Sequence, residues 1–179
     1  MSDELVLTDD GRIDFNQLVE AVGVQSTENG KSQSPHYFAK RTIVKFGELI
    51  RSDLSRDQGT PYDDEDVGEG VEQDAVGDIV ISLADWAYRA DVSVHGTIQP
   101  SEAVSKDVAL SVAMNATCTI YVASVLSGDT MNASYELHNL LCDLAAVCEH
   151  KGYDFHQCVY ERWGEVAGHD SNSGLLGDT

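Results

Sequence analysis

The chain has 179 residues, of which 42% are hydrophobic and 23% charged, a composition typical of a single globular domain. Its 31 Asp and Glu residues outnumber its 11 Lys and Arg residues, which gives a formal net charge of −20 at pH 7. Such a charge repels phosphate backbones and anionic lipid surfaces, so we expect neither nucleic acid nor membrane as a partner. Two interpretations of the acidity remain open: carboxylates that bind divalent cations, or an acidic surface suited to a salt-rich cytoplasm.

The chain shows no sign of export or membrane insertion. The sequence contains no run of 18 apolar residues, which is the length that would predict a membrane span. Its acidic N-terminus does not resemble a signal peptide. We therefore expect a cytoplasmic protein. The cysteines lie in apolar helical patterns without a C-x-x-C pair, which predicts buried free thiols. A zinc site built from cysteines and nearby histidines is the alternative. The four cysteines are Cys118, Cys142, Cys148 and Cys158. The possible zinc ligands are His138, Cys142, Cys148, His150, His156 and Cys158.

The first third of the chain predicts two helices. Residues 1–12 are expected to form an acidic, flexible lead. Over residues 14–22, apolar side chains recur at i, i+3, i+4 and i+7, which predicts an amphipathic helix with Asp14 as its N-cap. Pro35 is a favoured first residue of a helix, and the apolar pattern after it predicts a second helix over residues 35–54.

The remainder of the chain also reads as helices. An acidic surface loop is expected between the second helix and a third helix over residues 71–89. Further helices are expected over residues 105–126, 133–151 and 155–167, followed by a flexible tail over residues 169–179. The predicted helix over residues 105–126 is rich in small residues and nearly uncharged, which suits the centre of a bundle or an interface. The predicted fold is an all-α bundle of five or six helices.

Two segments of the predicted domain, residues 13–168, resemble each other. Residues 78–94 (DIVISLADWAYRADVSV) can be placed in register with residues 139–155 (NLLCDLAAVCEHKGYDF). A true duplication would make the chain a fusion of two helical units, residues 35–98 and 105–168. Chance similarity between helices rich in Leu and Ala is the alternative.

Carboxylates one helical turn apart are the candidate functional groups. Asp74 and Asp78 are spaced i, i+4 on the third predicted helix, and Glu48 lies among apolar residues on the second. Oxygen ligands at this spacing point to one spot and can hold Mg²⁺. A solvated helix face explains Asp74 equally well, but explains Asp78 less well because Asp78 begins an apolar stripe.

These motifs carry a resemblance to a known family. Residues 34–49 (SPHYFAKRTIVKFGEL) and 73–94 (QDAVGDIVISLADWAYRADVSV) resemble the MazG-like all-α NTP pyrophosphatases. Gly47-Glu48-Leu49 matches the end of the family's first acidic motif, and Gly77-Asp78-Ile79 matches its second motif. The resemblance implies a MazG-like bundle, oligomeric assembly, a nucleotide substrate, and Mg²⁺-dependent hydrolysis of an NTP to NMP and pyrophosphate.

The resemblance also implies roles for individual residues. Glu48 and Asp78 would be catalytic, and Mg²⁺ would be held by Glu48, Asp74, Asp78 and, from the second unit, Glu136. Three further residues would contact the nucleotide, with Trp86 stacking on the base; packing of Trp86 in the core is the alternative, and its helical spacing favours it. These substrate-binding candidates are Lys45, Trp86 and Asn139.

The sequence departs from the family pattern at three acidic positions. Val44 and Lys45 stand where the family has two Glu residues, and Ala75 replaces the Glu of its Glu-x-x-Asp motif. Lys45 places a positive charge where a metal ion would lie. Two hypotheses follow: an NTP pyrophosphohydrolase, weakened by the lost ligands, or a catalytically inactive MazG-like fold that binds nucleotides, regulates or interacts with proteins.

Overall fold

The computed structural model describes residues 7–28, 34–58, 69–102 and 130–168. Every regular element in these residues is an α-helix, which confirms the predicted all-α bundle. None of these helices has an apolar stretch sufficient to cross a lipid bilayer. The helices are α1 (Phe15–Glu28), α2 (Pro35–Gln58), α3 (Glu69–Ala90), α5 (Thr130–Lys151) and α6 (Phe155–Ala167).

The helices begin close to the predicted residues. The Asp14 carboxylate accepts hydrogen bonds from the backbone N–H groups of Asn16 and Gln17, as expected of an N-cap. α2 begins at Pro35 as predicted and continues to Gln58, four residues beyond the expected end. α6 has the predicted limits because Asp154 caps its first turn and Gly168, with φ 73°, ends it.

Residues 7–12 differ from the expected flexible lead. They form a turn that is closed by an isolated antiparallel bridge between Leu7 and Ile13. The Thr8 N–H donates to the Arg12 carbonyl at 2.8 Å, and the Gly11 N–H donates to the Thr8 carbonyl at 2.9 Å. The turn is anchored because Ile13 is buried and its N–H donates to His156 Nδ1 at 3.1 Å. The other predicted segments, residues 1–6, 105–126 and 169–179, lie outside the described residues, as does Cys118.

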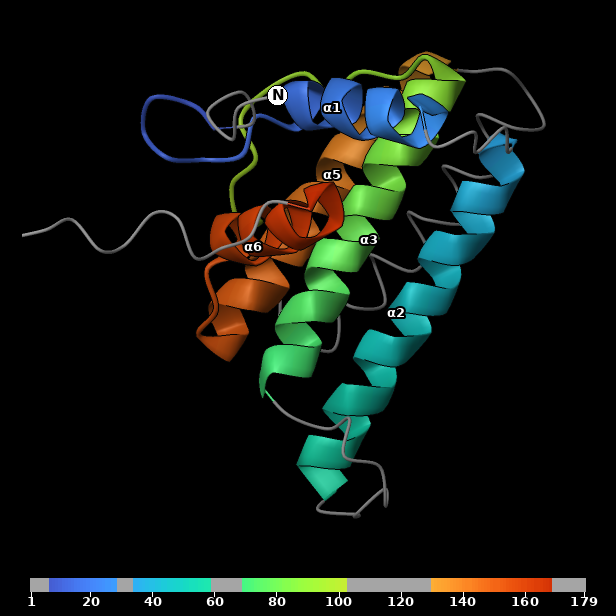
Figure 1. Ribbon diagram of the computed structural model, residues 1–179. Coiled ribbons are helices and arrows are strands. Elements are labelled where there is room, and N and C mark those ends of the chain that lie inside the picture. The colour runs from blue at the N-terminus through green and yellow to red at the C-terminus, as the bar shows by residue number, and fades with distance from the viewer. Residues whose placement is uncertain (1–6, 29–33, 59–68, 103–129, 169–179) are drawn as a thin grey trace, which may run out of the picture.

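α3 is the central helix of the described structure. It packs against α2 on one side and against α5 and α6 on the other, while α1 crosses near its C-terminal end (Figure 1). Each residue from 75 to 87 is buried, as expected of a helix surrounded by other helices. α3 therefore fixes the position of every side chain that it carries.

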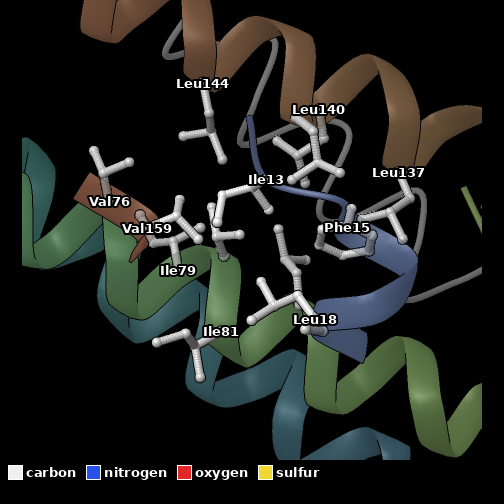
Figure 2. Close-up of a cluster of buried hydrophobic side chains, with 14 of the residues drawn as sticks. Ile13, Phe15, Leu18, Val76, Ile79, Ile81, Leu137, Leu140, Leu144 and Val159 are labelled. Atoms are coloured by element: carbon white, nitrogen blue, oxygen red, sulfur yellow. The ribbon is translucent and has the colours of Figure 1, made fainter. Parts of the chain in front are cut away.

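A shared hydrophobic core joins the N-terminal turn to the helices. Leu137, Leu140 and Leu144 of α5 point toward Ile13 and Phe15, beside apolar side chains of α3 (Figure 2). The three leucines are fully buried. Burial of each such side chain stabilises the fold by about 1.5–3 kcal/mol relative to leaving it in water.

Candidate functional site

The predicted carboxylates Glu48 and Asp78 lie on neighbouring helices, α2 and α3, and meet at a lysine. Lys45 Nζ lies 2.8 Å from Glu48 Oε2 and 2.9 Å from Asp78 Oδ2, so one ammonium group bridges both carboxylates. Glu48 is half exposed, whereas the Asp78 side chain is 10% exposed. The cluster thus runs from the surface of α2 into the packed contact between α2 and α3.

A second cation binds the other oxygen of Asp78. Arg162 of α6 donates from Nε to Asp78 Oδ1 at 2.7 Å, and its Nη1 binds Glu165 Oε2 at 2.5 Å. Gly77 makes this contact possible, since a Cβ there would lie 2.4 Å from the Arg162 Cβ and 2.9 Å from the Cys158 carbonyl oxygen. α6 can therefore approach α3 closely enough to place a guanidinium beside Asp78.

The ion pairs dominate the protonation of this cluster. Burial raises the pKa of Asp78, but hydrogen bonds from Arg162 and Lys45 outweigh it, so the pKa lies below its ordinary value. Burial lowers the pKa of Lys45, but hydrogen bonds to Glu48 and Asp78 outweigh this effect and raise it. The pKa of Arg162 is likewise raised, chiefly by Asp78. Near neutral pH the cluster therefore consists of charged, mutually paired groups.

Asp74 is near this cluster, but its pKa is shifted in the direction opposite to that of Asp78. Burial raises its pKa above the ordinary value, even though Arg162 favours the charged form. With Glu48 and Asp78 it lines a cavity of about 370 Å³ between α2 and α3. The other lining residues are Arg51, Ser52, Val71 and Ala75. The structure therefore brings together three of the four predicted metal ligands at one cavity.

The arrangement of these carboxylates does not fit a magnesium ion. Mg²⁺ requires near-octahedral oxygen coordination at 2.0–2.1 Å. Here the space between Glu48 and Asp78 is spanned by the Lys45 ammonium, and Ala75 offers no oxygen where the resembled family has a carboxylate. Among the residues that the structure describes, no three His, Cys, Asp or Glu side chains are grouped so as to hold a metal ion.

Glu136 does not join the site, contrary to the shared-site prediction. The first turns of α5 adjoin the segment that follows α3: Ser134 donates to the Ser93 carbonyl, and Tyr135 shares a cavity with Asp91. Asp78 lies 13 residues before Asp91, which corresponds to about 20 Å at 1.5 Å per helical residue. Glu136 therefore lies near the opposite end of α3. Asn139 follows it by one turn of the same helix, and no contact joins it to the Lys45 cluster.

The prediction that Trp86 binds the substrate is also wrong. Its side chain is 1% exposed and belongs to the hydrophobic core, so its ring cannot stack on a nucleotide base. Its Nε1 atom has no hydrogen-bond partner among the residues that the structure describes. The core position follows from α3 being covered on all sides, which the apolar spacing of this helix already favoured. Cys148 and Cys158 are buried free thiols, as predicted.

Sequence reasoning missed two contributors to the charged interior. Arg162 was not singled out, although Gly77 one residue before Asp78 indicated a close approach by another helix. A second buried ion pair joins Glu72 Oε2 to Lys151 Nζ at 3.1 Å, and the Tyr153 hydroxyl donates to the same carboxylate at 2.9 Å. The available signal was Glu72 itself, a carboxylate one helical turn before Val76 in the apolar stripe of this helix.

Comparisons of the chain with protein-family models, with curated proteins and with solved structures found no match. The resemblance to MazG-like proteins therefore stays a prediction from the two motifs, and the site is interpreted from its own geometry.

Proposed function

We propose that this chain is a non-hydrolytic, MazG-like helical module that acts by binding a protein partner. One observation carries the proposal: the Lys45 ammonium lies within 2.9 Å of both Glu48 and Asp78, where a catalytic metal ion would have to bind. A divalent ion would have to displace this ammonium and compete with Arg162 for the remaining oxygen of Asp78.

The cavity beside the cluster disfavours a nucleotide triphosphate in the absence of metal. Three carboxylates line it, namely Glu48, Asp74 and Asp78. Among its lining residues in the described structure, Arg51 is the one cation. Without Mg²⁺ the phosphates would face uncompensated negative charge, which raises the cost of binding. A partner recognised through the outer helical surface is the better-supported role.

Mg²⁺-dependent NTP pyrophosphohydrolysis is the second candidate. It is favoured by the shared cavity, because Glu48, Asp74 and Asp78 converge there from two helices. If this activity exists, hydrolysis must begin with Lys45 leaving the two carboxylates. The two candidate functions thus differ in whether a divalent metal ion displaces the Lys45 ammonium from Glu48 and Asp78.

Pyrophosphate release from a panel of nucleoside and deoxynucleoside triphosphates tests the proposal. The protein is assayed with Mg²⁺ or Mn²⁺ at low and at molar salt, and we expect no release. Mg²⁺-dependent release that disappears in Asp78→Asn would overturn the proposal and establish the second candidate.

A paired variant makes the test informative in both directions. Lys45→Glu with Ala75→Glu supplies carboxylates at two positions where the resembled family has them. Because five carboxylates then repel one another, we expect this variant to be less stable without metal and to regain stability on addition of Mg²⁺. The unaltered chain should show no Mg²⁺-dependent change in its melting temperature. A matched Lys45→Gln variant separates the loss of the ammonium from the gain of ligands.

A further inference from the structure

The outward face of α2 exposes an unusual number of apolar side chains. Val44 is 61% exposed, Tyr37 46% and Ile43 43%. These are three of the six large hydrophobic residues that are exposed in the described structure. α2 packs against α3 and lies at the edge of the described helices, so its opposite face is directed away from α1, α3, α5 and α6 (Figure 1).

Gly47 on this face has no explanation in the part of the chain that the structure describes. It lies in the middle of a 24-residue helix, where glycine is less favourable than alanine. A Cβ built at Gly47 would meet no atom of the described residues within 4 Å, so their packing does not require a glycine. A bare position on an exposed helix is what close approach of another backbone or side chain requires.

The charge of α2 also differs from that of the whole chain. The helix contains five of the 11 Lys and Arg residues but only three of the 31 Asp and Glu residues. Lys40 and Arg41 are exposed, and within the described residues neither forms an ion pair. Glu48, on the next turns of the same face, is half exposed and can accept a second cation beside Lys45.

These residues form a stripe that complements itself. At 100° per residue, positions 37, 40, 41, 44, 47, 48 and 51 fall on one side of the helix, centred on Val44. If a second α2 is laid antiparallel about a two-fold axis at Val44, the two Val44 side chains meet. Arg41 of each copy then lies beside Glu48 of the other, and Lys40 passes over the bare backbone at Gly47.

We propose that this face of α2, defined by Lys40, Arg41, Val44, Gly47 and Glu48, is a self-association surface on which a second copy of the chain docks antiparallel. The interface is isologous, so each favourable contact occurs twice. It joins the two chains through the one described helix with a surplus of cations, and leaves the acidic remainder of each chain directed outward. The inference does not rest on the proposed function, because it holds whether or not Lys45 yields to metal.

Sedimentation equilibrium of the full chain over a concentration series tests this interface. We expect a species of twice the 19.4 kDa chain mass that dissociates on dilution. Val44→Glu and Gly47→Leu should shift the equilibrium to monomer, because each places an obstacle on the two-fold axis or beside it. Tyr135→Glu is the matched control, since Tyr135 is 65% exposed on α5 and should leave the dimer intact.

A charge exchange tests the antiparallel arrangement itself. Arg41→Glu places two carboxylates side by side twice in each dimer, and we expect the dissociation constant to rise about tenfold. Glu48→Arg should weaken the dimer similarly, whereas the double variant should recover most of the affinity. Far-UV circular dichroism of each variant verifies that the helices remain.

Three outcomes would overturn the inference. The first is a chain that stays monomeric at every concentration, and the second is a dimer that is indifferent to Val44→Glu. The third is a double variant no better than its parents, which would indicate a different acidic partner for Lys40 and Arg41. None of these results depends on pyrophosphate release, so failure here is distinguishable from failure of the proposed function.

Discussion

Three buried carboxylates on α3 each bind a cation from their own chain. Glu72 pairs with Lys151 at 3.1 Å, Asp78 with Arg162 at 2.7 Å, and Asp85 with Arg89 at 3.1 Å. A buried carboxylate without such a partner would be strongly destabilising. Asp78, which the sequence favoured as a metal ligand, joins α3 to α6, and Glu72 joins α3 to α5, whereas the Asp85–Arg89 pair lies within α3.

Two aspartates one turn apart should respond oppositely to neutralisation. Asp78→Asn removes charged hydrogen bonds to Lys45 and Arg162, and we expect a loss of about 1–3 kcal/mol in unfolding free energy at pH 7. Because the pKa of Asp78 is lowered in the folded state, this contribution is complete above the ordinary value of 3.8 and vanishes as pH falls through the lower folded value. Unfolding in urea at pH 7 and near pH 3 measures the difference, which should shrink on acidification.

Asp74→Asn is the matched control. Burial raises the pKa of Asp74 in the folded state, so its charged form opposes folding at neutral pH, and removal of the charge should stabilise the protein. A stabilising Asp78→Asn or a destabilising Asp74→Asn would contradict the arrangement of charges described for the cluster.

The Glu72–Lys151 pair should show strong coupling. Their side chains are 2% and 1% exposed, so removing one partner leaves the other's buried charge without its opposite charge at 3.1 Å. We expect Glu72→Leu or Lys151→Met to cost about 3–5 kcal/mol each. The double variant Glu72→Leu with Lys151→Met should cost less than the sum of the two single losses. Denaturant unfolding of all variants gives the coupling energy, and additive losses would refute the pairing.

Only part of the site could be predicted from residue identities. Lys45 at an expected acidic position indicated a charge in place of metal, and the structure places its ammonium between Glu48 and Asp78. Glu136 was grouped with Glu48 and Asp78 by sequence register alone. Register does not show which end of α3 lies beside the first turns of α5. Arg162 was inaccessible to the same reasoning because its partner lies 84 residues away.

At the scale of helices, periodicity identified each described element but gave the full length of α6 alone. α1 was predicted to end at residue 22, yet it continues to Glu28. Its last turns hold because the Ser26 hydroxyl donates to Asp85 Oδ2 at 3.0 Å and accepts from Arg89. Similarly, α3 begins two residues before the predicted start, at Glu69. Polar tertiary contacts thus accompany the longer C-terminal end of α1, and an apolar pattern carries no information about such contacts.

Two glycines in adjacent helices should respond oppositely to alanine. Gly47→Ala has open space and gains helix propensity, so we expect it to stabilise the monomeric fold by about 0.5–1 kcal/mol. Gly77→Ala places a Cβ 2.4 Å from the Arg162 Cβ, so α6 must move, and we expect a loss of about 1–3 kcal/mol.

Thermal and denaturant unfolding of both variants, at concentrations low enough to avoid association, measures these effects. Equal destabilisation by the two substitutions would show that Gly47 is also packed in solution. A neutral Gly77→Ala would show that α6 does not approach α3 as closely as the structure indicates.

At the scale of the whole molecule, several of the few Lys and Arg side chains are bound to interior carboxylates and are not available to the surface. Lys45, Arg89, Lys151 and Arg162 all bind carboxylates in the interior or at its edge. Few positive charges are left for the surface of a chain whose net charge is −20. The acidity therefore consists of a small, internally neutralised set on α3 and a larger set that repels itself in solution.

This division predicts how salt affects stability. Screening weakens the repulsion among exposed carboxylates, while the buried pairs are screened far less. We expect the melting temperature to rise as KCl is increased from about 0.01 M to about 1 M, over which the Debye length falls from about 30 Å to about 3 Å. Equal ionic strengths of KCl and K₂SO₄ should agree below about 0.3 M if screening alone acts. A further rise at higher concentration, larger in sulfate, would indicate exclusion of salt from the protein surface. A melting temperature that falls steadily with salt would mean that the ion pairs around Asp78 and Glu72 outweigh the surface repulsion, and would remove the support for adaptation to a saline environment.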